Sequence, residues 1–121
     1  MQQRNHKDLR AWQAAMRLTQ EIYALTSKFP KEELFGLSSQ MRRAAVSVPS
    51  NIAEGSARNS TKELIHFLSI ATGSLSELDT QLELTKLLGY SEDIGNIQAT
   101  LDETTALILA MAKSLKNKLQ T

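Results

Sequence analysis

The side chains that most often ligate metals or act as catalytic bases are scarce in this 121-residue sequence, which has two histidines and no cysteine. Glu63 and His66 have the E-x-x-H spacing of di-iron carboxylate bundles, where a glutamate and a histidine one turn apart bind one metal. Such sites need a second E-x-x-H and two further inward glutamates, and the sequence has no second copy. His6 has no cysteine partner for a zinc site or a Cys-His nucleophile. We therefore expect no metal centre.

Adjacent acidic residues are no better arranged for catalysis. They form the pairs Glu32-Glu33, Glu92-Asp93 and Asp102-Glu103. These pairs fall in a connection or on solvent-facing helical positions, and neighbouring positions of a helix point in different directions. Glycine-rich phosphate-binding loops and the G-x-S-x-G nucleophile motif are also absent from the sequence. We expect a protein that is not an enzyme and has no cofactor.

Arginine is the residue type best suited to bind a ligand in this sequence. Arg10 and Arg17 lie two helical turns apart and share a face, and Arg42 and Arg43 form the densest basic pair. A guanidinium donates two hydrogen bonds in a fixed fork that matches a phosphate group. These four arginines are therefore the candidate contacts for RNA or DNA.

Charge is unevenly distributed along the chain. The formal net charge is +1, but residues 1–62 hold ten Lys or Arg against five acids, and residues 63–121 hold four against eight. Repetition of a modest basic patch around an oligomer would add to the release of counterions from a nucleic acid. The alternative is that the arginines pair with acids of the second half, within or between subunits.

Few turn signals interrupt the chain, and they divide it into four segments with helical periodicity. The expected helices run from about 9 to 28, from about 37 to between 55 and 59, from 61 to 89, and from about 92 to at least 118. Asp8, Ser60 and Ser91 are the expected N-caps. Gly36 and Gly89 are expected to end helical turns, since glycine permits the left-handed conformation.

The first helix carries two parallel apolar stripes. We assign one stripe to the core: Leu9, Trp12, Met16, Thr19, Tyr23 and Thr26. The stripe beside it, which we assign to a subunit interface, is Ala15, Leu18, Ile22 and Leu25. In the third helix a single stripe recurs at spacings of three and four: Leu64, Leu68, Ala71, Leu75, Leu78, Leu82 and Thr85.

Pro49 lies inside the second helix. Proline removes one backbone hydrogen bond and its ring presses on the carbonyl of Ala45, so we expect a kink or a local break there. Ser47, Ser50 and Asn51 flank the proline and are the expected donors to the freed carbonyls. The core face of this helix is Leu37, Met41, Ala44, Val48, Ile52 and Gly55.

Short connections between long helices predict an all-α fold, an antiparallel up-down-up-down four-helix bundle, in a single domain over residues 1–121. Residues 106–112 are seven consecutive apolar residues, and a helix that is apolar on every side is buried on every side. We therefore expect a homo-oligomer of closed cyclic symmetry. Its candidate interface residues are Leu18, Leu25, Leu107 and Leu109.

The amino-terminal residues contain no apolar run that resembles a signal peptide, and no stretch of about 18 apolar residues occurs anywhere in the sequence. The absence of cysteine fits a reducing compartment. We expect a cytoplasmic protein without a membrane partner.

Residues 40–55, QMRRAAVSVPSNIAEG, follow FGLSS and precede ATGSLSELDTQLELTKLLGY at residues 71–90. These segments resemble the four-helix-bundle proteins encoded in intervening sequences of large-subunit ribosomal RNA genes, and the resemblance covers nearly the whole chain. It implies a small bacterial cytoplasmic protein whose characterised relatives form ring-shaped homopentamers. Related accessory proteins of diversity-generating retroelements form basic pentamers that contact a reverse transcriptase and nucleic acid.

Several positions of this sequence match the motif of that family. The matching positions are Arg42, Arg43, Pro49, Ser50, Asn51, Glu54 and Gly55. We interpret them as residues that shape the end of the second helix, with Glu54 available to pair with an arginine. The near-neutral charge of this chain departs from the retroelement proteins and weakens the transfer of strong nucleic-acid binding.

The sequence thus favours a non-enzymatic oligomeric bundle that binds RNA, DNA or a protein that handles them through arginines of its first two helices. The alternative is a structural or protein-interaction ring with no role in nucleic-acid binding.

Overall fold

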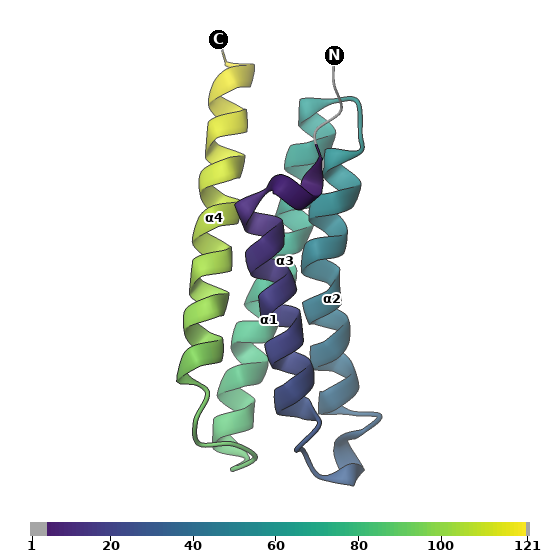
Figure 1. The fold of residues 1–121 in the computed structure, drawn as a ribbon, viewed down its shortest axis with the longest axis vertical. Coiled ribbons are helices and arrows are strands. Elements are labelled where there is room, and N and C mark those ends of the chain that lie inside the picture. The colour runs from purple at the N-terminus through teal and green to yellow at the C-terminus, as the bar shows by residue number, and fades with distance from the viewer. Residues whose placement is uncertain (1–4, 121) are drawn as a thin grey trace.

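The computed structural model describes residues 5–120 and contains four long helices packed side by side (Figure 1). The helices are α1 (Arg10–Thr26), α2 (Leu37–Ser56), α3 (Thr61–Leu87) and α4 (Gly95–Leu119). Two short 3₁₀ turns, η1 (His6–Asp8) and η2 (Lys31–Glu33), precede α1 and α2 respectively. The described residues include no strand, and the prediction of an all-α four-helix fold is confirmed.

The helices form a four-sided bundle. Helix α1 packs against α2 and α4, and α3 packs against the same two helices, so α1 and α3 lie on one diagonal. Figure 1 shows successive helices joined at alternate ends of the bundle. The face formed by α1 and α2 is therefore opposite the face formed by α3 and α4.

The apolar stripes of three helices meet in the centre of the bundle. All seven residues of the stripe expected for α3 are buried. In α2 the buried apolar positions include Met41, Ala44, Val48 and Ile52, and in α4 they include Ile97, Leu101, Ile108 and Leu115. Each fully buried Leu or Ile side chain contributes roughly 1.5–3 kcal/mol to stability.

Helix α1 faces the core with the stripe that we assigned to a subunit interface. Leu18 is fully buried and Leu25 nearly so, whereas Met16 and Tyr23 are each 42% exposed. The assignments of Leu18 and Leu25 to an interface, and of Met16 and Tyr23 to the core, are therefore wrong. The buried stripe is purely apolar and includes small alanines, so α1 can approach its neighbours closely, while the phenol of Tyr23 stays at the surface.

The apolar run in α4 is not enclosed by its own bundle. Ile108 is fully buried and Leu107 packs partly against the core, but Leu109 is 51% exposed, and Ala106 and Ala110 are exposed as well. Leu107 and Leu109 therefore stay predicted interface residues.

Two of the expected helix ends form as predicted. The Ser60 hydroxyl accepts a hydrogen bond from the Glu63 amide at 3.2 Å. Gly89 has φ +73°, and the amides of Gly89 and Tyr90 donate to carbonyls of the last turn of α3. This pair of bonds is the Schellman arrangement, in which glycine avoids the strain of the left-handed conformation.

The other two N-cap predictions are wrong. Asp8 lies within η1, and Leu9 is the N-cap of α1. Helix α4 begins at Gly95 after the N-cap Ile94, so Ser91 does not cap it. The connection is three residues longer than expected, and it buries Ile94 before the helix starts.

Helix α2 continues through Pro49 without a break, while the expected kink stays a prediction. Proline has no N–H to donate to the Ala45 carbonyl. The Thr19 hydroxyl of α1 lies 3.2 Å from this carbonyl oxygen and 2.8 Å from that of Ala15, so its single hydrogen serves both. The donor comes from the neighbouring helix and not from the flanking Ser47 or Asn51.

Gly55 lies at a close contact between α2 and α3. Its surroundings are more crowded than those of Gly73 and Gly95, the other glycines of the described helices. A Cβ at this position would lie 2.8 Å from Cβ of Phe67 and 3.0 Å from Cδ1 of Leu64. Glycine is required here because there is no space for a side chain, not because of its backbone freedom.

The shared hydroxyl of Thr19 gives a prediction for Thr19→Val. Loss of the donor leaves the buried Ala45 carbonyl unpaired, and we expect the free energy of unfolding to fall by about 1–3 kcal/mol. In a Pro49→Ala background the new N–H supplies that hydrogen bond, so the same change costs less. Urea unfolding of the four variants should give a coupling above about 0.5 kcal/mol, and additive effects would contradict the assignment.

The packing at Gly55 predicts opposite effects for two glycine-to-alanine changes. Gly55→Ala forces α2 and α3 apart and lowers the free energy of unfolding by about 1–3 kcal/mol. Gly73 is the matched control, since it lies inside α3 with nothing within 4 Å of its Cβ position. Gly73→Ala should raise stability by roughly 0.5–1 kcal/mol. Equal effects in thermal unfolding would refute the steric explanation.

Candidate functional site

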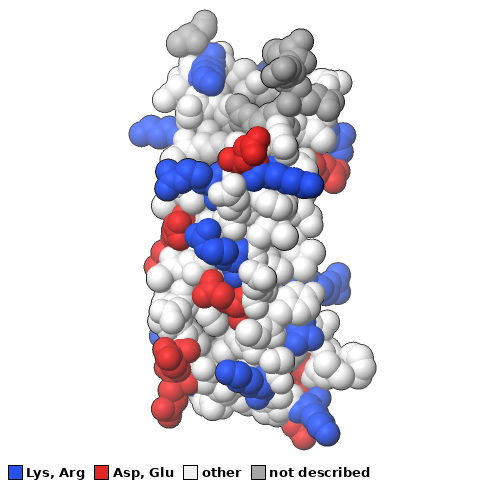
Figure 2. All heavy atoms as spheres, in the orientation of Figure 1, with Lys and Arg blue, Asp and Glu red and all other residues white. Residues whose placement is uncertain are grey.

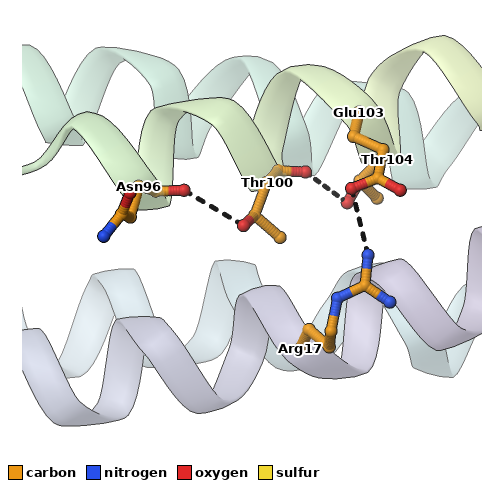
Figure 3. Close-up of polar contacts among 5 residues, drawn as sticks. All are labelled: Arg17, Asn96, Thr100, Glu103 and Thr104. Atoms are coloured by element: carbon orange, nitrogen blue, oxygen red, sulfur yellow. Dashed lines mark hydrogen bonds and ion pairs between the residues drawn. The ribbon is translucent and has the colours of Figure 1, made fainter.

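Arg17 is held by an acidic residue of the second half of the chain. Its Nη2 lies 3.0 Å from Oε2 of Glu103, which joins α1 to α4 (Figure 3). On the same stretch of α4, the hydroxyl of Thr104 donates to the Thr100 carbonyl and that of Thr100 to the Asn96 carbonyl (Figure 3). The pairing that the sequence left open is thus present for Arg17, and its charge is balanced within the bundle.

Arg42 is fixed against α1. Its Nε donates to the hydroxyl of Thr26 at 2.8 Å, and its guanidinium carbon lies 4.8 Å from the ring centre of Tyr23. The Thr26 hydroxyl in turn donates to the Ile22 carbonyl. Both terminal nitrogens of the Arg42 guanidinium stay available, because these contacts use only Nε and the face of the group.

Arg10 and Arg43 are exposed and make no hydrogen bond or ion pair with any residue that the structure describes. Arg10 begins α1, and 13 residues of helix, about 20 Å, separate it from Tyr23, beside which Arg42 lies. The four candidate arginines therefore do not converge on one site. Figure 2 shows the same pattern on one face of the molecule, where Lys and Arg alternate with Asp and Glu.

Arg42 and Arg43 instead border a groove between α1 and α2, which we call the basic groove. It has a volume of about 630 Å³ and no acidic residue lines it. Its apolar lining consists of Tyr23, Leu34, Phe35 and Val46. Phe35 is 93% exposed, which is exceptional for an aromatic side chain of a folded domain.

Glu33 fixes the connection that carries Leu34 and Phe35. Its Oε1 accepts from the amide of Leu37 at 3.1 Å, and its Oε2 accepts from the Tyr90 hydroxyl at 2.6 Å. A Cβ on Gly36 would lie 2.8 Å from the same Oε1. The expected left-handed conformation of Gly36 is wrong, since its φ is −115°. A side chain at this position would displace the Glu33 carboxylate from its present place.

The hydrogen bond between Glu33 and Tyr90 also shifts both acid-base equilibria. It lowers the pKa of the Glu33 carboxyl, with a further contribution from the Leu37 amide, because both bonds favour the charged carboxylate. It raises the pKa of Tyr90, because the phenol must stay protonated to donate. The Tyr90 ring packs against Phe29 with ring centres 5.2 Å apart. The connection is therefore tied to the α3–α4 connection at neutral pH.

A second groove lies on the opposite face, between α3 and α4, and we call it the acidic groove. It has a volume of about 520 Å³, and no Lys or Arg lines it. Its lining includes Leu75, Leu101, Ala106, Leu109, Asp79 and Asp102. The side-chain amide of Gln98 donates to Oδ1 of Asp79 at 2.9 Å and to Oδ1 of Asp102 at 3.0 Å. One amide group thus holds two carboxylates of different helices close together.

The motif residues at the end of α2 have structural contacts. The Asn51 side-chain amide donates to the carbonyl and the hydroxyl of Ser47, and Ser74 of α3 donates to the same hydroxyl. Glu54 pairs with Arg58 one turn later at 2.8 Å. Pro49 and Gly55 are buried, whereas Ser50 is exposed. Four of the five thus shape or pack the helix, as the sequence suggested.

Within residues 5–120, no three His, Asp or Glu side chains gather where they could hold a metal ion. His66 is exposed and packs edge-on against Phe67. The described helices include none that is long and apolar enough to cross a membrane.

Sequence reasoning missed both grooves. The signal for the basic groove was present in Leu34 and Phe35, two large apolar residues in a short connection next to the Arg42-Arg43 pair. Asp79 and Asp102 lie 23 positions apart on different helices, so their proximity depends on how α3 and α4 are aligned. The alternation of apolar and charged residues within one helix does not reveal that alignment.

Residues 7–110 match the model of one protein family, described as the 23S rRNA-intervening sequence protein. No curated protein matches the chain. The match spans the last two residues of η1, all of α1, α2 and α3, and α4 as far as Ala110, so it includes both grooves and most of the bundle. It agrees with the resemblance carried by the segments around Arg42-Arg43 and residues 71–90, and the chain belongs to the 23S rRNA-intervening sequence protein family.

Proposed function

We propose that this protein is a non-enzymatic cytoplasmic subunit that assembles with copies of itself. A ring of five copies is the form that the family resemblance implies. The observation that carries the proposal is the exposure of large apolar side chains on a bundle that already has a complete core. Phe35 is 93% exposed and Leu87 is 79% exposed.

These side chains lie outside the buried core of the single chain. Leu34, Leu88 and Leu109 are each about half exposed as well. Scattered apolar residues are normal on a protein surface, but Leu34 and Phe35 are contiguous with Tyr23 and Val46 in one groove. Covering such a groove removes apolar area from water, which is the main driving force of association.

Nucleic-acid binding by the assembled protein is a second candidate. It is favoured by Arg10 and Arg43, whose guanidinium groups have no partner among the described residues and are open to a phosphate. A single chain offers few such groups, and acidic residues lie between the basic ones (Figure 2). Binding therefore depends on repetition of these arginines by symmetry.

Self-assembly predicts a mass several times that of one chain at micromolar concentration. Light scattering coupled to size exclusion should give five times the 13.4 kDa of the monomer. A stable monomer would overturn the proposal, and an oligomer of another size would overturn only the number five.

Nucleic-acid binding predicts an affinity that falls with salt in filter-binding titrations. The slope of log K against log salt is negative. Its magnitude should decrease by about 0.7–0.9 for each phosphate contact removed by Arg10→Ala or Arg43→Ala. Arg17→Ala is the matched control, because Glu103 already neutralises that charge, and it should change the slope least. Absence of binding at low salt, or an affinity that does not depend on salt, would exclude this function.

A further inference from the structure

The two grooves of this protein are complementary in charge. Arg42 and Arg43 border the basic groove, and no carboxylate lines it. Asp79 and Asp102 border the acidic groove, and no cation lines it. Both grooves also present exposed apolar side chains, Phe35 on one and Leu109 on the other.

Both grooves have charged groups that the fold leaves available. Gln98 occupies one oxygen of Asp79 and one of Asp102, and the other oxygen of each carboxylate has no hydrogen-bond partner among the described residues. Two like charges held this close favour a cation between them. On the opposite face, Arg43 and the terminal nitrogens of Arg42 are such cations.

The charged residues lie within about one helical turn of each other along the bundle. Helices α2 and α4 begin at the same end (Figure 1). Thr19 of α1 contacts Ala45 of α2, three residues after Arg42, and Arg17 of α1 contacts Glu103 of α4, one residue after Asp102. These contacts place Arg42 and Asp102 about four residues, or about 6 Å, apart along the axis. Bundles placed side by side, with their axes roughly parallel, thus bring these groups opposite each other.

We propose that the basic groove of one copy of this chain binds the acidic groove of the next copy. In this contact Arg42 and Arg43 face Asp79 and Asp102, and Phe35 packs on the apolar lining that includes Leu109. The inference rests on the proposed function and specifies which surfaces carry out the assembly. Because the two contacting surfaces are different, the contact is heterologous, and each added copy leaves one groove of each kind open until a ring closes.

A nucleic acid is a poorer occupant of the basic groove. Aromatic rings and arginines do bind single strands, but the groove is lined by aliphatic Leu34 and Val46 as well, which match neither bases nor phosphates. A nucleic acid also leaves the acidic groove unexplained. A second copy of the chain accounts for both grooves with one contact.

The test uses one variant for each groove and then mixes them. Phe35→Asp alters the basic groove and Leu109→Arg the acidic groove, and both positions are exposed, so the bundle should still fold, as circular dichroism will show. We expect each variant alone to assemble about tenfold or more weakly than the natural protein, as when a central interface side chain is lost. The 1:1 mixture should assemble more tightly than either variant alone, because each variant keeps one intact groove and Asp at position 35 of one variant faces Arg at position 109 of the other.

Leu119→Arg is the matched control, since Leu119 is a half-exposed apolar residue of α4 that lines neither groove. It should assemble like the natural protein. A charge exchange provides a second test: Arg43→Asp should weaken assembly, and Arg43→Asp combined with Asp102→Arg in one chain should restore it, because the attraction is re-formed with reversed signs.

The outcomes separate the inference from the proposed function. If the natural protein is a monomer, the proposed function fails. If it assembles but Leu109→Arg assembles equally well, or the mixture assembles no better than either variant alone, the proposed pairing is wrong and self-assembly stands. If Phe35→Asp keeps its assembly and loses binding to single-stranded RNA or DNA, the basic groove belongs to a nucleic acid and the inference is overturned.

Discussion

Burial of Leu, Ile, Val and Ala side chains between four helices is the interaction on which the rest of this structure depends. Among residues 5–120, twenty-three apolar residues are buried, and each large one contributes roughly 1.5–3 kcal/mol. The ion pairs of Arg17, Arg58 and Lys86 lie on side chains that are about half exposed, where such pairs contribute about 0–1 kcal/mol each. The apolar core therefore holds the bundle together, and the surface ion pairs add little to its stability.

The fold follows closely from the periodicity of the sequence, and α1 shows where that reasoning ends. A single stripe in α3 has only one possible inner face, and all of it is buried. Helix α1 offers two stripes of similar length, and the choice depends on how closely the alanines of one stripe let α2 and α4 approach. This closeness of approach depends on α2 and α4, so the sequence of α1 alone does not reveal it. The acidic groove could not be predicted either, because Leu109 differs from a core residue only in its surroundings, whereas Phe35 in a short connection was a signal for the basic groove.

The arginines illustrate the same limit for the candidate site. Their positions in the sequence suggested one basic patch, but the bundle places Arg17 beside Glu103 and Arg42 beside Tyr23. Opposite charges of the two halves meet within the chain at Arg17, and we propose that they meet between chains at Arg42 and Arg43. In this view the near-zero net charge reflects self-complementarity, which limits the affinity for a polyanion.

Glu33 anchors the connection that carries the exposed Phe35. Its carboxylate holds the Leu37 amide on one side and the Tyr90 hydroxyl on the other, so the connection between α1 and α2 is anchored to the far end of α3. A side chain on an anchored connection loses less conformational entropy when a partner covers it. Acid weakens this anchor, since protonation of Glu33 removes the charge that both donors favour. The aromatic contact is thus preorganised before any partner arrives.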